Sequence, residues 1–222
     1  MIPKTFAIVF SLVAMLALTG SQCVIIATSG GRHPDCSDED TDKDPCPVVI
    51  VATGRLVDAP VQGVRYVSGS RSGTTGVNGE FQYELDTPVR FFIGDIPLGE
   101  TVRGKAVITP LDLVPDGTID TPAVINIARL LQSLDAVPGD GRISIPAKVR
   151  AAAVRSNAAV SSPVRFLDFA DEPAFVNAAS HLVAVLTASY PFTAVLVDAA
   201  SAKQHLVESL AGSGIAVKIP RK

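Results

Sequence analysis

The chain has 222 residues, of which 47% are hydrophobic and 18% are charged, and its formal net charge at pH 7 is -3. This balance is typical of a folded protein and excludes a wholly disordered one. Aromatic residues make up 5%, tryptophan is absent and no stretch concentrates cations. A surface for nucleic acid needs both stacking rings and a basic patch, so no nucleic-acid partner is expected.

Residues 1–22 have the pattern of a secretory signal peptide. Lys4 precedes an apolar run from Phe6 to Leu18, and small residues follow the run. The run is shorter than a membrane-spanning helix requires, so it predicts export and cleavage. An N-terminal core helix is the alternative explanation of the same run.

Cys23 follows the small residues Gly20 and Ser21. This ending resembles a bacterial lipoprotein signal, in which the cysteine directly after the cleavage site is lipidated. Such signals usually carry an aliphatic residue where Gly20 stands and a small one where Gln22 stands. The resemblance implies a lipid on Cys23 that holds the protein at a membrane of the cell envelope, such as the outer membrane. Cleavage after Ser21 without lipidation would instead give a secreted protein.

Residues 23–47 are predicted to form an acidic tether. Within them, residues 35–46 carry six acids and one lysine, and such a segment repels itself into extended shapes. The alternation of Asp38, Asp40 and Asp42 makes these residues weak calcium candidates, because oxygen ligands alternate in calcium-binding loops. The turn glycine and closing glutamate of an EF-hand are missing, so a solvated spacer is favoured over a calcium site.

Cys36 and Cys46 bracket the acidic run. In an oxidising compartment, two nearby cysteines most often form a disulfide, and this pair is predicted to do so. No metal is favoured at the two thiols, because their spacing is not that of a zinc site. No other cofactor is expected.

Residues 48–109 are predicted to form a small antiparallel β-sandwich, because short alternating runs are separated by frequent turns. The apolar run Val48–Thr53 predicts a strand buried on both faces, and Asn78-Gly79 predicts a tight turn. The serine- and glycine-rich stretch Ser68–Gly76 predicts a loop with a hairpin tip. It does not form a nucleophile elbow, because Arg71 stands at the central position that a serine would need.

The stretch from Gly54 to Val64, followed by Thr75 and by Gly79-Glu80-Phe81, resembles the carboxypeptidase regulatory-like domain. This resemblance implies a small transthyretin-like β-sandwich that is typically non-catalytic and occurs in exported proteins. The family usually has an aspartate after the threonine, and Gly76 stands there in this chain.

Residues 110–222 are predicted to be a helical region that packs on the sandwich, which makes the fold class α+β. The three- and four-residue spacing of apolar residues predicts a helix from Thr121 to Leu134. Further helices are expected over 146–156, from Glu172 until Pro191 breaks the pattern, and from a capping box at Ser201 to Gly212.

The loop after the first of these helices carries Asp135 and Asp140. Together with the preceding residues 126–134, it resembles a segment of poorly characterised exported bacterial proteins, in which the loop is more acidic. The two aspartates are weak calcium candidates. Termination of the helix by proline and glycine explains the loop without a metal, and is favoured.

Catalytic residues are not identified by any spacing in the sequence, so a non-enzyme is favoured over an enzyme. His181 and His205 lie in predicted helices, where a lone histidine is more often a packing or surface residue than a base.

The leading hypothesis is an exported cell-envelope lipoprotein with a structural or binding role, such as adhesion or docking of an envelope or extracellular protein. The alternative is a secreted hydrolase or an accessory domain of one. Such an enzyme would need paired carboxylates, for example from Asp168, Asp171 and Glu172.

Overall fold

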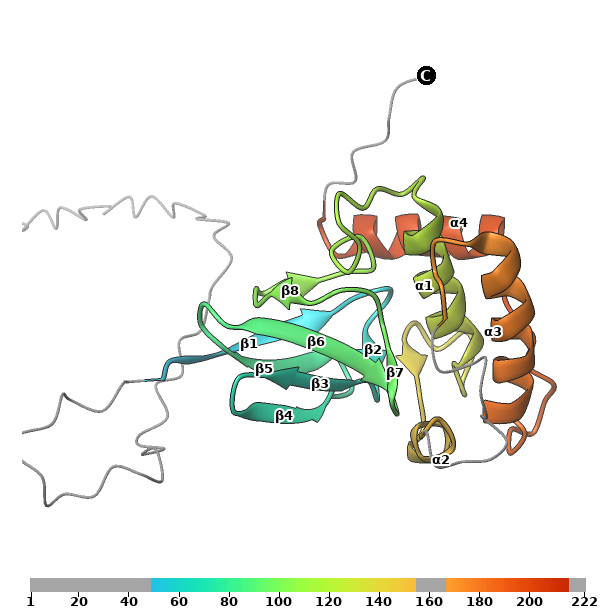
Figure 1. The fold of residues 1–222 in the computed structure, drawn as a ribbon, viewed down its shortest axis with the longest axis horizontal. Coiled ribbons are helices and arrows are strands. Elements are labelled where there is room, and N and C mark those ends of the chain that lie inside the picture. The colour runs from blue at the N-terminus through green and yellow to red at the C-terminus, as the bar shows by residue number, and fades with distance from the viewer. Residues whose placement is uncertain (1–48, 155–166, 216–222) are drawn as a thin grey trace, which may run out of the picture.

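The computed structural model describes residues 49–154 and 167–215 and shows an α+β protein, as predicted (Figure 1). A layered β half comes first in the chain and four helices follow, at one end of the sheets. The strands are β1 (Val51–Leu56), β2 (Val61–Gln62), β3 (Arg65–Ser68), β4 (Arg71–Thr74), β5 (Glu80–Glu84), β6 (Pro88–Ile93), β7 (Ile96–Pro97), β8 (Val102–Arg103), β9 (Val107–Ile108) and β10 (Ile143–Ser144). The helices are α1 (Pro122–Ser133), α2 (Ala147–Ala152), α3 (Glu172–Leu186) and α4 (Ala199–Gly212).

Two main sheets make the sandwich. One has the strand order β5-β1-β9, and the other has the order β4-β3-β6-β7 with β8 paired to β6. Most pairs are antiparallel, as predicted, but β9 runs parallel to β1, and β10 forms a separate parallel pair with β2. The β10–β2 pair ties the segment after α1 to the β half, which no local pattern in the sequence indicates.

Phe81 on β5 is at the centre of the sandwich and is 1% exposed. Its ring lies 5.8 Å from that of Tyr66, 5.7 Å from that of Tyr83 and 5.1 Å from that of Phe91, measured between centroids. These distances suit edge-to-face and tilted aromatic packing between the two sheets. Alternation of apolar side chains along β3, β5 and β6 therefore builds the core that the sequence predicts.

Thr75 shows how the residues of the family-like stretch hold the loops together. Its buried hydroxyl donates to the carbonyl of Val61 at 2.7 Å and accepts from the amide of Val64 at 2.9 Å. Gly79 follows the predicted turn with a φ of 78°, a conformation that glycine adopts readily.

Two β predictions were wrong in detail. β1 begins at Val51, and Val49 and Ile50 before it are 49% and 45% exposed rather than buried on both faces. The register shows why, because pairing with β5 begins at Val51 opposite Glu84.

The stretch predicted as a loop over Ser68–Gly76 also contains a strand. β4 pairs with β3 from Ser68↔Arg71 to Arg65↔Thr74, so the tip of the hairpin is confined to Gly69 and Ser70. A serine- and glycine-rich composition conceals the strand, because its stability comes from pairing with β3 rather than from its own propensity.

Helices α1, α3 and α4 lie where the sequence predicts them, but the N-cap of α4 differs. The predicted capping box at Ser201 is wrong: α4 begins earlier, and Asp198 accepts the amide hydrogen of Ser201 at 3.0 Å. At α1, the Thr121 hydroxyl makes no cap hydrogen bond within the helix and instead accepts from the amide of Thr118 at 2.9 Å.

One apolar cluster extends from the sheets into the helices. It joins the sandwich residues around Phe81 to Ile127 and Leu131 of α1 and to Phe175 and Leu182 of α3. A smaller cluster packs Leu206 and Leu210 of α4 against α1. The predicted boundaries at 47/48 and 109/110 stay predictions. Within the described ranges, no helix has the length and apolar content that crossing a membrane would require.

Candidate functional site

Asp58 is a fully buried carboxylate in the turn between β1 and β2. Its side chain has no exposed surface, and the next residue, Ala59, has a φ of 57°. Pairing between Val57 and Pro60 closes the turn. Because the turn lies under helices α1 and α4, it aims the Asp58 carboxylate at those helices rather than at water.

Two side chains from distant parts of the chain reach this carboxylate. Gln132 at the end of α1 donates from its Nε2 to the two oxygens of Asp58, at 3.3 and 3.0 Å. His205 on α4 places its Nδ1 3.3 Å from Oδ1 of Asp58. The cluster thus connects the β1–β2 turn to α1 and α4, through residues 74 and 147 positions further along the chain.

Burial and pairing shift the two acid–base groups of this cluster. Removal from water raises the pKa of Asp58 above its ordinary 3.8, and hydrogen bonds from His205 and Gln132 oppose that rise. The hydrogen bond to Asp58 raises the pKa of His205 above 6.5, although partial burial of the ring opposes the effect. The pair therefore holds a proton more firmly than a free histidine would.

His205 borders a surface hollow of about 370 Å³. Gln132, Asp135 and Arg142 line the same hollow, and glycines and a proline of the loop after α1 form its wall. The side chain of His205 is 43% exposed. Because Nδ1 faces Asp58, Nε2 is the ring nitrogen left to meet a ligand in the hollow.

The hollow offers hydrogen-bonding and acid–base chemistry but no nucleophile. Among the described residues that line it there is no serine, threonine or cysteine. A histidine oriented by a buried carboxylate can accept or donate a proton, and covalent catalysis needs a further group. The arrangement is therefore better suited to binding a polar group than to forming a covalent intermediate.

Asp135 and Asp140, the predicted calcium candidates in this loop, turn towards donors of their own loop. Asp135 accepts from the amides of Val137 at 3.1 Å and Ser144 at 2.9 Å. Asp140 accepts from the amide of Arg142 at 3.0 Å and from its Nε at 2.9 Å. Over the described ranges, no three acids, histidines or cysteines are grouped in a way that could hold a metal ion.

The carboxylates of Asp168, Asp171 and Glu172 do not converge on one point. Asp168 accepts from the amides of Ala170 and Asp171, and Asp171 caps α3 by accepting from the amide of Ala174 at 3.1 Å. Glu172 instead lies 3.5 Å from a guanidinium nitrogen of Arg129. These contacts show that the acids shape the start of α3 and its pairing with α1.

Arg129 on α1 is a buried cation, only 6% exposed. Its Nε donates to the carbonyl of Val197 at 2.7 Å, and its Nη1 donates to Asn126 at 3.0 Å. Its hydrogen bonds hold the segment before α4 against α1, which explains its burial without a ligand.

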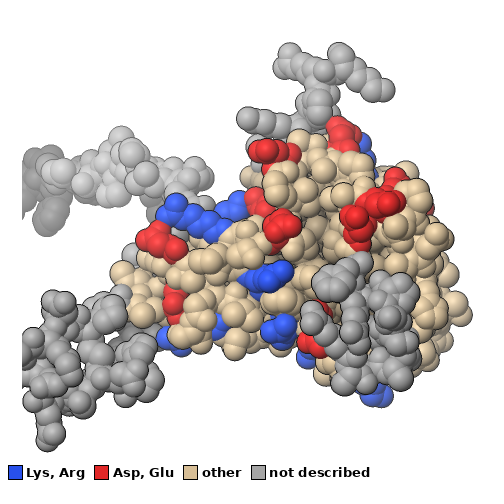
Figure 2. Space-filling view, viewed as in Figure 1, with Lys and Arg blue, Asp and Glu red and all other residues tan. Residues whose placement is uncertain are grey.

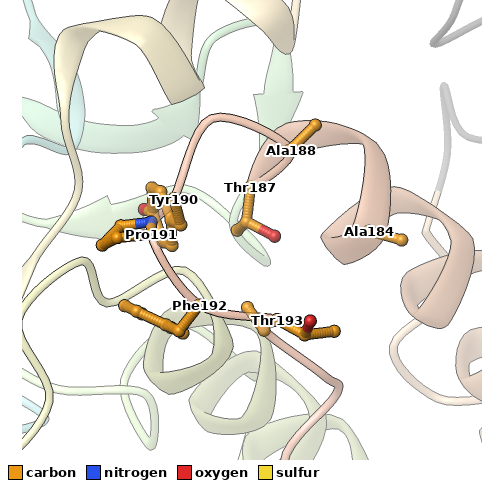
Figure 3. Close-up of a pocket in the computed structure, with 8 residues that line it drawn as sticks. Ala184, Thr187, Ala188, Tyr190, Pro191, Phe192 and Thr193 are labelled. Atoms are coloured by element: carbon orange, nitrogen blue, oxygen red, sulfur yellow. The ribbon is translucent and has the colours of Figure 1, made fainter.

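A second hollow, of about 330 Å³, lies at the C-terminal end of α3 (Figure 3). Thr187 lines one side, and Tyr190, Pro191 and Phe192 line the other (Figure 3). Two of its hydroxyls already have partners: the Tyr190 hydroxyl donates to the carbonyl of Leu134 at 2.6 Å, and Thr187 donates to the carbonyl of Val183 at 2.7 Å. Burial raises the pKa of Tyr190 to about 12, so this hydroxyl remains a donor at neutral pH. The hollow is therefore a weaker site candidate than the one beside His205.

Several predicted sites lie outside the described residues. They are the lipidated cysteine, the disulfide pair and the calcium candidates of the tether: Cys23, Cys36, Cys46, Asp38, Asp40 and Asp42. All of them stay predictions.

Sequence reasoning missed the cluster around Asp58. The local sequence gives Asp58 no role and indicates that His205 is a residue of ordinary packing or surface, because nothing near either one in the sequence points to the other. His181 does lie on the surface. The one available signal was the odd placement of a histidine on a face of α4 that also carries Ala202 and Leu206, and that signal is weak without a partner.

Comparison with known proteins gives a short partial match. Over 68 residues, or 29% of this chain, the sequence is 37% identical to YghJ of Escherichia coli O78:H11 (strain H10407 / ETEC) and to the AcfD homolog of Escherichia coli strain K12. Both are named as candidate lipoproteins. The matched part is 4% of their length, so this chain spans only a small part of the curated relatives it matches. No protein-family model matches the chain, and no solved structure matches it significantly.

Proposed function

We propose that this protein is an exported lipoprotein of the bacterial cell envelope. The observation that carries the proposal is the 68-residue likeness to two proteins named as candidate lipoproteins. It agrees with the signal-peptide pattern of residues 1–22 and with Cys23 directly after it.

Acylation of Cys23 would provide the anchor. Each methylene of an acyl chain that enters the bilayer contributes about 0.8 kcal/mol, so several chains hold a protein at a membrane almost permanently. The acidic residues between Cys23 and the folded body would be repelled by anionic lipid headgroups. The segment would thereby hold the body away from the membrane surface.

We further propose a non-catalytic binding role for the folded body, in docking or adhesion to an envelope or extracellular partner. The hollow beside His205 supports this role, since Gln132, Asp135, Arg142 and His205 line it. These four side chains combine donors and acceptors with both signs of charge. Such a surface suits a polar partner group better than an apolar one.

A secreted hydrolase, or an accessory domain of one, is the second candidate. The observation in its favour is the contact between the buried Asp58 and His205, because a carboxylate that orients a histidine is a recurring part of hydrolytic sites. If this candidate is right, H205Q abolishes a hydrolytic activity of the purified protein. If the binding role is right, H205Q and R142Q weaken capture of a specific envelope partner, and K203Q, whose residue does not line the hollow, leaves it unchanged.

The lipoprotein proposal is tested by detergent partitioning of the wild type and of C23S expressed in a bacterium. We expect the wild type in the detergent phase with a modified N-terminus at Cys23, and C23S in the aqueous phase. Circular dichroism should show the same folded body in both, because position 23 precedes every strand. A wild-type protein found wholly in the aqueous phase, with an unmodified N-terminus beyond residue 23, would overturn the proposal.

A further inference from the structure

The sheet made of β3, β4, β6, β7 and β8 carries charge of a single sign. Its strands contain four arginines and no acidic residue: Arg65, Arg71, Arg90 and Arg103. Figure 2 shows basic atoms over the sheet, while acidic atoms gather at one end of it and over the helical half. This sheet therefore presents a cationic surface on a protein whose net charge is -3.

Two of these arginines flank one aromatic ring on the outward face. The guanidinium carbon of Arg65 lies 4.0 Å from the centroid of Phe92, and that of Arg90 lies 5.5 Å from it. The register agrees, because Arg65 is opposite Phe92 and Val67 is opposite Arg90. Stacking on the ring holds both cations in place and leaves most of their N–H groups free for an anion.

Neither cation is neutralised within the described part of the chain. Arg65 donates its Nε to the carbonyl of Gly94 at 3.2 Å, and no described carboxylate forms an ion pair with Arg65 or Arg90. By contrast, Arg103 at the edge of the sheet is already paired with Asp86. The unpaired positive charge is thus concentrated around Phe92.

Arg71 adds a third unpaired cation where the N-terminal segment joins the body. Val51, the first residue of β1, is opposite Glu84, and Glu84 accepts from the amide of Ser70 at 2.9 Å, next to Arg71. The Nε of Arg71 is buried and has no hydrogen-bond partner among the described atoms. A carboxylate arriving from the N-terminal side would satisfy it.

The chain itself supplies such carboxylates at a suitable distance. Residues 35–46 hold six acids and one lysine, and Asp44 is five residues before Val49. At roughly 3.3 Å per residue, Asp44 reaches about 17 Å from Val49 and Asp38 about 36 Å. Ile50 is hydrogen-bonded to Leu85, only five residues before Arg90 along the chain. Arg90 therefore lies within about 17 Å of Leu85, and the acids around Asp38 can reach it.

We propose that the acidic segment 35–46 docks on the arginine face formed by Arg65, Arg90 and Phe92, with Arg71 at the near end. Opposite charge and short chain length favour this occupant, since a tethered segment has an effective concentration in the millimolar range. Exposed ion pairs are weak one by one, so the docked and free states exchange. Docking would shorten the distance that the segment spans. An anionic competitor or high salt would release the segment and lengthen that distance. The proposal does not depend on acylation of Cys23.

Trypsin cleavage after Lys43, within the segment, tests the docking. The protein is the full mature chain carrying C23S, so that it remains free of lipid. At low salt, we expect cleavage after Lys43 to be about threefold slower in this protein than in its R65Q/R90Q variant, as a few weak ion pairs imply. The difference should vanish in 1 M salt, where screening acts within about 3 Å.

A matched control removes two positive charges from the helical half. K148Q/K203Q changes the exposed Lys148 of α2 and the half-buried Lys203 of α4, which is paired with Asp120, and should leave the protection of Lys43 intact. Equal cleavage in wild type and R65Q/R90Q would overturn the proposal. An equal loss of protection in K148Q/K203Q would also overturn it, because that result would reflect net charge alone. Protection of Lys43 that appears only when vesicles of anionic lipid are present would overturn it as well.

A second measurement covers the case in which R65Q/R90Q fails to fold. D38N/D40N/D42N alters only the acidic segment, before the folded body begins. NMR shifts of the Nε–H groups of Arg65 and Arg90 should differ between this variant and the parent at low salt and agree at high salt. Identical shifts at low salt would contradict docking.

Discussion

At the scale of single residues, Asp58 is the unusual feature of this protein. A fully buried carboxylate is costly unless it is paired, and here Gln132 and His205 provide the partners. Removing one partner would leave the other group unsatisfied. The cluster therefore restricts substitution at each of its three positions more than it adds to the net stability of the fold.

The raised pKa of His205 makes the free energy of unfolding depend on pH. A histidine whose pKa is higher in the folded state binds its proton more tightly there, so its stabilising effect is complete below 6.5, its ordinary value. We expect that stability to be lost as the pH rises through the folded-state pKa. The raised pKa of Asp58 acts in the same direction, in a more acidic range above 3.8. Denaturant unfolding between about pH 5.5 and 9, a range that spans the ordinary histidine pKa of about 6.5, measures the effect.

The size and origin of this pH effect can be checked with variants. Because His205 is half exposed, the effect should stay below about 1 kcal/mol. D58N should lower the pKa of His205 measured by NMR and flatten the slope, even though Asp135 and Glu208 also face the ring and remain. A His205 pKa that D58N leaves unchanged would show that Asp58 does not control it.

At the scale of secondary-structure elements, the start of α4 shows how a cap is chosen. Both Asp198 and Ser201 have side chains that can cap a helix, and a search by local pattern prefers Ser201 because Gln204 follows three residues later. The fold selects Asp198, because the carbonyl of Val197, one residue earlier, is held by Arg129 of α1. The direction from which the chain arrives decides the cap.

Replacement of each residue by alanine distinguishes the two caps. D198A should lower the melting temperature by about 2–4 °C, as loss of an N-cap does in a protein of this size. S201A should change it by less than about 1 °C, because its side chain is exposed and caps nothing. Differential scanning calorimetry of both variants measures this contrast, and a larger effect for S201A would contradict Asp198 as the cap.

At the scale of the whole molecule, the continuous apolar cluster predicts a single unfolding transition. Leu131 of α1 is fully buried in the cluster that also contains Phe81 of the sandwich. L131A should therefore destabilise both halves together, by about 2–5 kcal/mol. Far-UV circular dichroism, which follows the helices, should coincide with tyrosine fluorescence measured in a Y190F background, where it comes from Tyr66 and Tyr83 of the sandwich.

The control for this prediction is V195A. Val195 is 70% exposed, so its truncation removes few contacts and should change stability by no more than about 0.5 kcal/mol. Two separate transitions in the wild type, or an L131A variant that melts only its helices, would show that the halves unfold independently.

The sequence by itself determined the α+β class, the order of the elements and most of the helix boundaries. Local periodicity carries this information: Phe81 and Tyr83 alternate on β5, and Ile127 and Leu131 repeat on α1. The turn at Asn78-Gly79 was also predictable, because few residues adopt positive φ without strain.

Only the tertiary structure decided the rest. Whether residues 71–74 form a strand depends on β3 beside them, and the burial of Val49 and Ile50 depends on where β5 ends. The partnership of Asp58 with His205 joins residues 147 positions apart. No periodicity encodes such a contact, because it arises from the way α4 packs on α1 above the β1–β2 turn. Neighbouring residues determine the local secondary structure, whereas this candidate site forms only once distant elements have packed together.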